Sequence, residues 1–194
     1  MNKNRLEAFS DGVIAIIITI MVLEMKVPHG TSFNDLLPVA PVFSSYVLSF
    51  IYIGIYWNNH HHLLQTVHRV NGSIMWGNLH LLFWLSLFPF VSGWMGENHF
   101  AAIPSALYGA ALLMAAFGWK ILQRAIIKTH GEHSVLASAV GEDRKGNLSM
   151  VLYAAGIAVA FWHAWISQIF YSAVALMWLI PDRRIERALE KQPH

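Results

Sequence analysis

The residues that could take part in chemistry lie at the ends of the first two apolar segments, next to charged residues. Asp11 precedes an apolar run that ends at Leu23, and His60 and His61 follow the second apolar segment. An acid and two imidazoles at one depth could form a hydrogen-bonded network between helices. A metal site would need three or four converging ligands, and consecutive histidines cannot all point to one side of a helix. Locally bonded interfacial histidines are the third alternative, and we expect no metal or cofactor.

Within the first apolar run, Thr19 is the one polar side chain. On a helix Ile16, Thr19 and Leu23 share one stripe. A neighbouring stripe holds the small residues Ala8, Gly12 and Ala15, which let helices approach closely. The pattern has two explanations. Either Ser10 and Asp11 cap the helix and Thr19 bonds back to its own backbone, or Ile16 and Leu23 narrow a pore that gates by dewetting.

The composition indicates a membrane protein that carries these residues on helices. The chain has 194 residues, of which 56% are hydrophobic and 12% charged, about half the charged fraction of a soluble domain. There is no cysteine, so disulfides, thiol nucleophiles and thiolate metal sites are excluded. The net charge of only +2 gives no indication of a surface that binds nucleic acid. The segment that ends at Leu23 lacks a small-residue cleavage site, so we expect a retained first span rather than a signal peptide.

Several function classes lack their sequence signatures. No apolar segment carries Asp, Glu, Lys or Arg at its middle, which counts against a proton-coupled transporter. The chain contains no HExxH, Walker lysine or GxSxG motif, so we do not expect an enzyme. It also has neither an arginine ladder nor a TVGYG-type filter.

We predict an all-α integral membrane protein, one domain over residues 1–194, with six transmembrane helices. The expected spans are about 8–25, 38–59, 72–93, 101–122, 148–163 and 167–180. The last two divide one apolar stretch, which as a single helix would extend about 50 Å against a hydrocarbon core of ~30 Å. We expect its turn between His163 and Gln168. With a cytoplasmic N-terminus, twelve of the 13 Lys and Arg lie inside and only Lys26 lies outside, as the positive-inside rule requires.

Three motifs resemble a known family. Arg5, Phe9, Ser10 and Asp11 form an RxxxFSD motif at the first apolar segment. Trp57, His60 and His61 form a WxxHH motif on the second, and the chain closes with LMWLIPDRRIE, Leu176 to Glu186. Together they resemble bacterial members of the transmembrane protein 175 potassium-channel family.

The resemblance implies six helices per subunit, with the first helix lining a central ion pathway. FSD occurs once here, which is typical of the single-repeat, tetrameric members. The family's apolar bottleneck falls on Ile16, with the hydroxyl of Thr19 near it and Leu23 as the next layer. The motif residues would form a structural network that ties the first helix to its neighbours: Arg5, Phe9, Ser10, Asp11, Trp57, His60 and His61.

The sequence therefore predicts a passive, potassium-permeable channel, a homotetramer in the cell membrane with both termini cytoplasmic. Its expected partners are its own copies, potassium ions and membrane lipids, and no nucleic acid. The alternative is a metal or proton-coupled transporter that depends on histidines, using His60, His61 and His80.

Overall fold

A computed structural model describes residues 2–131, 134–141 and 143–179, and every regular element in them is a helix, which confirms the expected all-α class. The α-helices are α1 Lys3–Met21, α2 Ala40–Gln65, α3 Gly72–Ser86, α4 Phe88–Glu97, α5 Ala102–His130, α6 Val135–Val140, α7 Arg144–Ala160 and α8 Ala164–Leu179. Two 3-10 helices, η1 Val22–Glu24 and η2 Phe33–Val39, lie between α1 and α2. Most of the closing motif at 176–186 falls outside the described residues.

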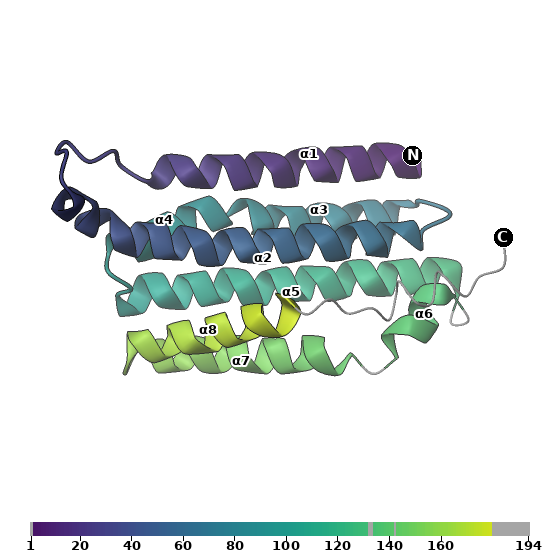
Figure 1. The fold of residues 1–194 in the computed structure, drawn as a ribbon. Coiled ribbons are helices and arrows are strands. Elements are labelled where there is room, and N and C mark those ends of the chain that lie inside the picture. Colours follow the sequence, from purple (N-terminus) through teal and green to yellow (C-terminus); the bar gives the residue numbers. More distant parts are fainter. Residues whose placement is uncertain (1, 132–133, 142, 180–194) are drawn as a thin grey trace.

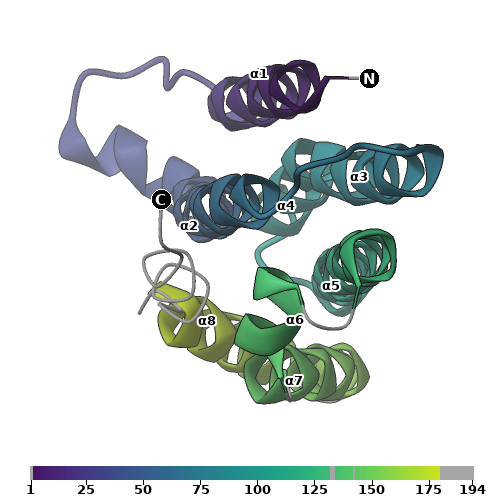
Figure 2. The same ribbon diagram turned by 90° about the vertical axis from the view of Figure 1, so that its right-hand side faces the viewer.

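The chain runs lengthwise along one bundle six times, as α1, α2, α3 with α4, α5, α7 and α8 (Figure 1). Seen from the end, α1 lies at one edge of the bundle and α7 and α8 at the opposite edge (Figure 2). Between them, α2 packs on α4 and α3 packs on α5. Helix α1 rests on α2, α3 and α4, so one of its sides faces the bundle and the other faces outward.

Among the residues that the structure describes, four helical segments are long and apolar enough to cross a membrane: Lys3–Glu24, Phe33–Gln65, Gly72–Glu97 and Ala102–His130. Helices α7 and α8 have 17 and 16 residues, so each is about 25 Å long. The turn between them lies at Phe161–His163, earlier than we predicted, because the backbone N–H of Ile166 already bonds the carbonyl of His163.

The start of the first helix differs from the prediction. Helix α1 begins at Lys3, and its N-cap is Asn2, whose side chain accepts a hydrogen bond from the backbone N–H of Asn4. Ser10 and Asp11 lie two turns inside the helix, so the interpretation of these residues as N-caps was wrong. Their polar side chains therefore need partners on other elements or on the same helix.

The third expected span is divided into two helices at Leu87. Pro89 has no N–H to donate to the carbonyl of Leu85, so the regular ladder is interrupted there. The N–H of Leu87 bonds the carbonyl of Trp84 in a tighter turn, and the ladder resumes where Val91 bonds Leu87. The apolar path then continues to Glu97 in α4.

Glycines set the closest approaches between helices. A Cβ atom at Gly77 would lie 3.1 Å from the Cα of Leu122, and one at Gly118 would lie 3.0 Å from the Cα of Leu81, so α3 and α5 pack almost backbone to backbone. At Gly96 in α4 a Cβ would lie 2.6 Å from the Cα of Val42 in α2. Small residues allow this contact between membrane helices, where packing rather than solvent exclusion drives association.

We expect Gly96→Ala to lower the free energy of unfolding by about 2 kcal/mol, because the new methyl group meets rigid backbone of α2. Gly54→Ala in α2 is the matched control, since nothing lies within 4 Å of a Cβ at Gly54 and alanine favours the helix. Unfolding of both variants in detergent micelles, followed by circular dichroism, tests this. Equal stability of the two variants would contradict the packing at Gly96.

Candidate functional site

A buried chain of hydrogen bonds joins α1, α3 and α2. The hydroxyl of Ser10 donates to the carbonyl of Leu6 at 2.8 Å and accepts from the side-chain amide of Asn78 at 2.9 Å. The carbonyl oxygen of Asn78 lies 2.7 Å from Nε2 of His60. Ser10, Asn78 and His60 are all buried, so each group satisfies another that lacks access to water.

The direction of these hydrogen bonds fixes the tautomer of His60. The Asn78 amide donates to Ser10, so its carbonyl oxygen faces the imidazole and Nε2 must carry the proton. Nδ1 of His60 is then an acceptor, and it is buried with no hydrogen-bond partner among the described residues. A proton added at Nδ1 would meet no acceptor, so the geometry suits a neutral histidine that orients Asn78.

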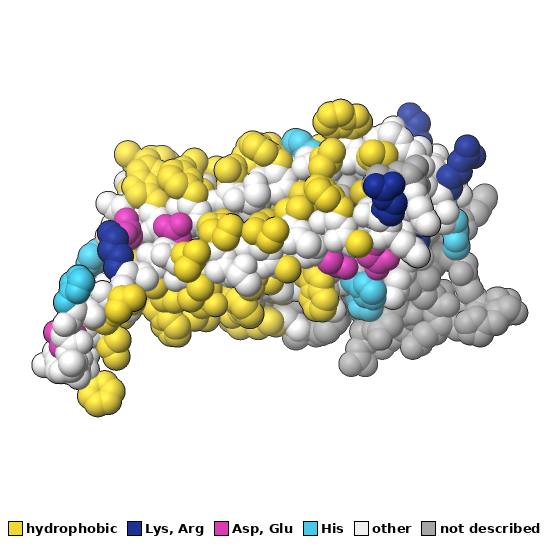
Figure 3. Space-filling view, turned by 90° about the horizontal axis from the view of Figure 1, so that it is seen from above, with side chains coloured by type: hydrophobic (Ala, Val, Ile, Leu, Met, Phe, Trp, Pro, Cys, Tyr) yellow, Lys and Arg dark blue, Asp and Glu magenta, His cyan; other side chains and the backbone are white. Residues whose placement is uncertain are grey.

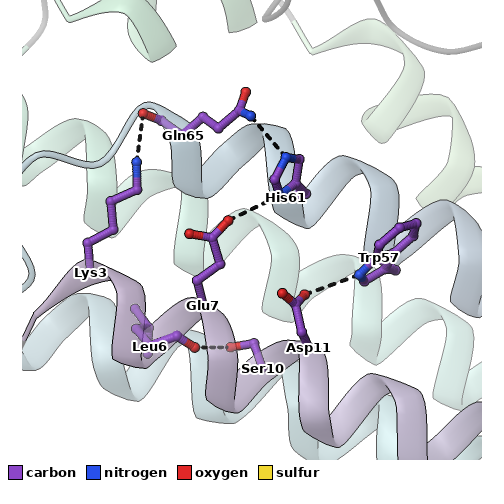
Figure 4. A network of polar contacts seen from close by, with 8 residues as sticks. All are labelled: Lys3, Leu6, Glu7, Ser10, Asp11, Trp57, His61 and Gln65. Carbon is purple, nitrogen blue, oxygen red and sulfur yellow. Dashed lines mark hydrogen bonds and ion pairs between the residues drawn. The ribbon is translucent and has the colours of Figure 1, made fainter.

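A second, more exposed set of contacts joins α1 to α2 (Figure 4). The indole N–H of Trp57 donates to a carboxylate oxygen of Asp11 at 3.1 Å. Nearer the N-terminus, Nδ1 of His61 lies 3.1 Å from a carboxylate oxygen of Glu7. The other ring nitrogen of His61 lies 2.9 Å from the side-chain nitrogen of Gln65, whose backbone carbonyl accepts from Lys3 at 3.2 Å. The contacts are one helical turn apart, because 3, 7 and 11 on α1 face 57, 61 and 65 on α2.

The structure brings together five of the seven motif residues predicted to form the network. Ser10 and His60 belong to the buried chain, and Asp11, Trp57 and His61 belong to the exposed set. Arg5 is exposed, and its side chain makes no hydrogen bond or ion pair with any residue that the structure describes. Phe9 is 51% exposed and points away from the core. Their part in a network stays a prediction.

Asn78 connects the motif residues, and sequence reasoning did not place it in the site. The available signal was an amide in the interior of an apolar segment, where polar groups need internal partners. That signal does not say which helix supplies the partner. The contact between α1 and α3 therefore came from the structure alone.

On the outward side of α1 the exposed side chains from Ala8 to Leu23 are apolar apart from Thr19, and no residue that the structure describes covers them. The buried residues of α1, on the side that faces the bundle, are Leu6, Ser10, Ile14, Ile17 and Met21. Ile16 and Leu23 lie on the other side, 58% and 76% exposed. Gly12 has no neighbour within 4 Å of a Cβ position. Figure 3 looks onto this side and shows apolar side chains over the middle of the bundle and charged ones toward its ends.

Thr19 lies on the same outward side as Ile16 and Leu23. Its hydroxyl bonds back to its own helix, at 3.1 Å to the carbonyl of Ala15 and 3.0 Å to that of Ile16. Because the proton is used in these bonds, the lone pairs of the Thr19 oxygen are left to face outward.

The histidines considered for a transporter do not converge. His60 faces Asn78, His61 faces Glu7, and His80 accepts a hydrogen bond from the indole N–H of Trp84 at 3.3 Å. Over 2–131, 134–141 and 143–179, no three His, Asp or Glu side chains are grouped as ligands for a metal ion. These residues therefore lend the alternative of a histidine-dependent transporter no support.

Comparison with known proteins gives three consistent matches. The family model described as endosomal/lysosomal potassium channel TMEM175 matches residues 5–89. A potassium channel from Chryseobacterium sp. (strain P1-3) is 56% identical over 191 residues, which cover 98% of this chain and 100% of that protein. A potassium channel from Streptomyces collinus is 34% identical over 131 residues, 63% of this chain and 64% of its own length.

A solved structure matches the fold. The crystal structure of a lysosomal potassium-selective channel TMEM175 homolog from Chamaesiphon minutus superimposes with a TM-score of 0.81 at 27% identity. The match covers 93% of this chain and 97% of that one.

The apolar helices long enough to cross a membrane, together with the matches to potassium channels, define a multi-pass helical membrane protein of ion-channel type. The near full-length match to the Chryseobacterium protein then decides the family. This chain belongs to the TMEM175 family.

We expect Asn78→Leu to lower the free energy of unfolding by about 2 kcal/mol, because it leaves the N–H of His60 buried without an acceptor. Ser86→Ala is the control in the same helix, since the exposed hydroxyl of Ser86 bonds only the carbonyl of Phe83. Thermal unfolding in detergent measures both. A variant at Asn78 as stable as the control would mean that the chain of bonds does not hold α1 in place.

Proposed function

We propose that four copies of this chain form a channel that conducts potassium passively along a central axis lined by α1. Relatives named potassium channels, one of them 56% identical, support the permeant ion. One α1 per chain cannot enclose a pore, whereas a ring of identical subunits closes it by symmetry. The tetramer is the expectation for a chain in which the FSD motif occurs once.

The observation that carries the proposal is the outward face of α1. From Ala8 to Leu23 its exposed side chains are apolar apart from Thr19, and they include the small residues Ala8, Gly12 and Ala15. Small side chains suit the close approach of four helices around an axis. The opposite side of α1 is held by buried hydrogen bonds, so its outward direction is fixed rather than free to rotate.

Ile16 and Leu23 are the proposed constrictions. Two turns apart on the outward face, they would form two apolar rings in a tetramer, and a narrow apolar ring closes to ions when it dewets. An apolar ring supplies no oxygen to replace lost hydration, so it favours cations that shed water at low cost. Thr19 lies between the two rings and offers four hydroxyl oxygens, each with its proton already bonded to backbone.

The proposed topology has six membrane crossings per subunit in the cell membrane. The first helix begins at Lys3, and its end of the bundle holds eight of the nine described Lys and Arg residues: Lys3, Arg5, Arg69, Lys120, Arg124, Lys128, Arg144 and Lys145. Lys26 alone lies at the other end, paired with Glu97 at 2.7 Å. This asymmetry supports a cytoplasmic N-terminus, and an even number of crossings brings the C-terminus to the same side.

Flux measurements test the channel. Purified protein in potassium-loaded liposomes should release potassium down its gradient without any chemical energy source, and a cross-linked or light-scattering mass should correspond to four subunits. Protein that releases no potassium but moves another solute together with protons would refute the proposal.

We expect Ile16→Asn to reduce the preference for potassium over sodium several-fold, because an amide at the constriction can hydrate either ion. Ile18→Ala is the matched control, since position 18 lies on the opposite side of α1 from position 16. Bi-ionic flux through liposomes reports the ratio of the two ions. If selectivity is unchanged at Ile16, the constriction lies elsewhere.

We expect Thr19→Val to lower potassium flux by about fivefold, the equivalent of about 1 kcal/mol in total for the ring of lost hydroxyl oxygens. Valine keeps the shape of threonine, so the rings at Ile16 and Leu23 should be unaffected. Single-channel conductance in planar bilayers is the sharper measurement. An unchanged conductance would show that ions pass this level without using the hydroxyl.

A further inference from the structure

The outer surface of α3 and α5 carries an apolar groove that the proposed ion pathway does not use. It has a volume of ≈ 470 Å³ and is lined chiefly by Ser73, Trp76, Leu79, His80, Phe83 and Ile121. Trp76 is 74% exposed and Phe83 is also exposed, although both are large aromatic side chains. In the end view α3 and α5 lie next to each other at one margin of the bundle, beyond α2 and α4 (Figure 2).

Two cations stand at one end of this groove. Along α5 the exposed residues Phe117, Ile121, Arg124 and Lys128 follow one another at steps of four, three and four, so they form one stripe that changes from apolar to cationic. Arg124 and Lys128 also line a neighbouring hollow with Ile127 and Gly131. The stripe therefore leads from the groove to a charged end.

Contacts between α3 and α5 fix which groove residues lie beside these cations. Gly77 lies against Leu122, and the side chain of Asn71 donates to the hydroxyl of Thr129 at 2.8 Å. Ser73, between Gly77 and Asn71, is thus level with the turn of α5 that carries Arg124 and Lys128. Trp76 lies one turn farther along the groove, at the boundary between charge and apolar surface.

The boundary coincides with the expected edge of the hydrocarbon. From Ala102 to Trp119, α5 has no charged side chain over about 27 Å, close to the ~30 Å of a bilayer core. Arg124 and Lys128 follow in the next two turns, at the depth of lipid headgroups. Tryptophan is enriched at the same level.

No described acid is available to neutralise the two cations. At this end of the bundle Glu7 contacts His61, Asp11 accepts from Trp57, and Asp143 caps α7 by accepting from the N–H of Gly146. The remaining described acids, Glu24, Asp35 and Glu97, belong to the opposite end. The side chains of Arg124 and Lys128 make no hydrogen bond or ion pair within the described ranges.

We propose that this groove binds an anionic phospholipid, whose phosphate lies between Arg124 and Lys128 and whose acyl chain follows Trp76, Ile121 and Phe83. The ligand's two chemical parts match the two parts of the surface, a cationic end at headgroup depth and an apolar trough within the hydrocarbon. A second copy of this chain fits less well, because it would have to present an unpaired acid at the same end, and no described residue supplies one. The site does not depend on ion conduction.

Lipid retention in native mass spectrometry tests the site. The full chain in neutral detergent is titrated with phosphatidylglycerol or with phosphatidylcholine of the same acyl chains. The wild type should retain about one phosphatidylglycerol per subunit in preference to phosphatidylcholine. The double variant Arg124→Gln with Lys128→Gln should bind phosphatidylglycerol roughly 25-fold more weakly, at about a factor of five for each cation.

Matched variants make the result specific. Lys3→Gln with Lys26→Gln removes the same net charge at positions away from the groove and should leave lipid retention unchanged. Arg124→Lys with Lys128→Arg keeps both cations and should retain the lipid as the wild type does. Trp76→Ala should weaken retention without changing the mass of the assembly. Inorganic phosphate and glycerol 3-phosphate should fail to displace the lipid, because they lack the acyl chain.

Three outcomes would overturn the proposal. The first is an undiminished preference for phosphatidylglycerol in the Arg124/Lys128 double variant. The second is dissociation of the assembly by Trp76→Ala, which would identify the groove as a contact between subunits. The third is displacement by inorganic phosphate or glycerol 3-phosphate, which would identify an anion site without a lipid. Because retention is measured without ion flux, a failure here leaves the channel proposal standing, and the reverse also holds.

Discussion

The structure depends on one constraint, that a polar group inside the hydrocarbon must find its partner within the protein. Ser10, Asn78 and His60 satisfy this constraint together, from three different helices. Each bond has a required direction, since the amide donates to the hydroxyl and the imidazole donates to the amide. The chain of bonds is satisfied at one rotation of α1 relative to α2 and α3, whereas apolar packing alone would tolerate several.

Fixing that rotation determines what α1 presents to the outside. Ile14 and Ile17 are buried, and Ile16, only one or two positions away, is exposed. A rotation of α1 by one residue would exchange them with little change in apolar area, because all are isoleucines. The hydrogen bonds at Ser10 and Asp11 therefore distinguish faces that hydrophobicity cannot distinguish. This explains why the polar motif lies on the same helix as the apolar stripe, one to three turns before it.

The sequence predicted the helical class, the family and the outward stripe, because each depends on local pattern. The low fraction of charged residues indicates a membrane protein, and the stripe follows from the helical period. The RxxxFSD motif can be recognised directly, because its residues are close together in the sequence. Sequence reasoning failed where the outcome depends on distant contacts. Nothing local says that Asn78 lies between Ser10 and His60. The interpretation of Ser10 and Asp11 as N-caps was wrong because the helix begins at Lys3, where Asn2 caps it. The break at Leu87 within the expected third span follows from the carbonyl of Leu85, which Pro89 leaves without a donor.

The two sides of α1 also differ in the kind of force that acts on them. On the inner side the directional hydrogen bonds and Met21, Ile17 and Ile14 anchor the helix to its own subunit. On the outer side, from Ala8 to Leu23, the exposed side chains are apolar apart from Thr19, and no described residue gives them a directional partner. This part of the surface suits packing against copies of itself around a symmetry axis, because the charge of Arg5 lies outside it, near the end of the helix. In the proposed tetramer, hydrogen bonds would hold α1 within its subunit and apolar contacts alone would hold it between subunits, so the central gap could change its width without breaking the bonds that orient the helix.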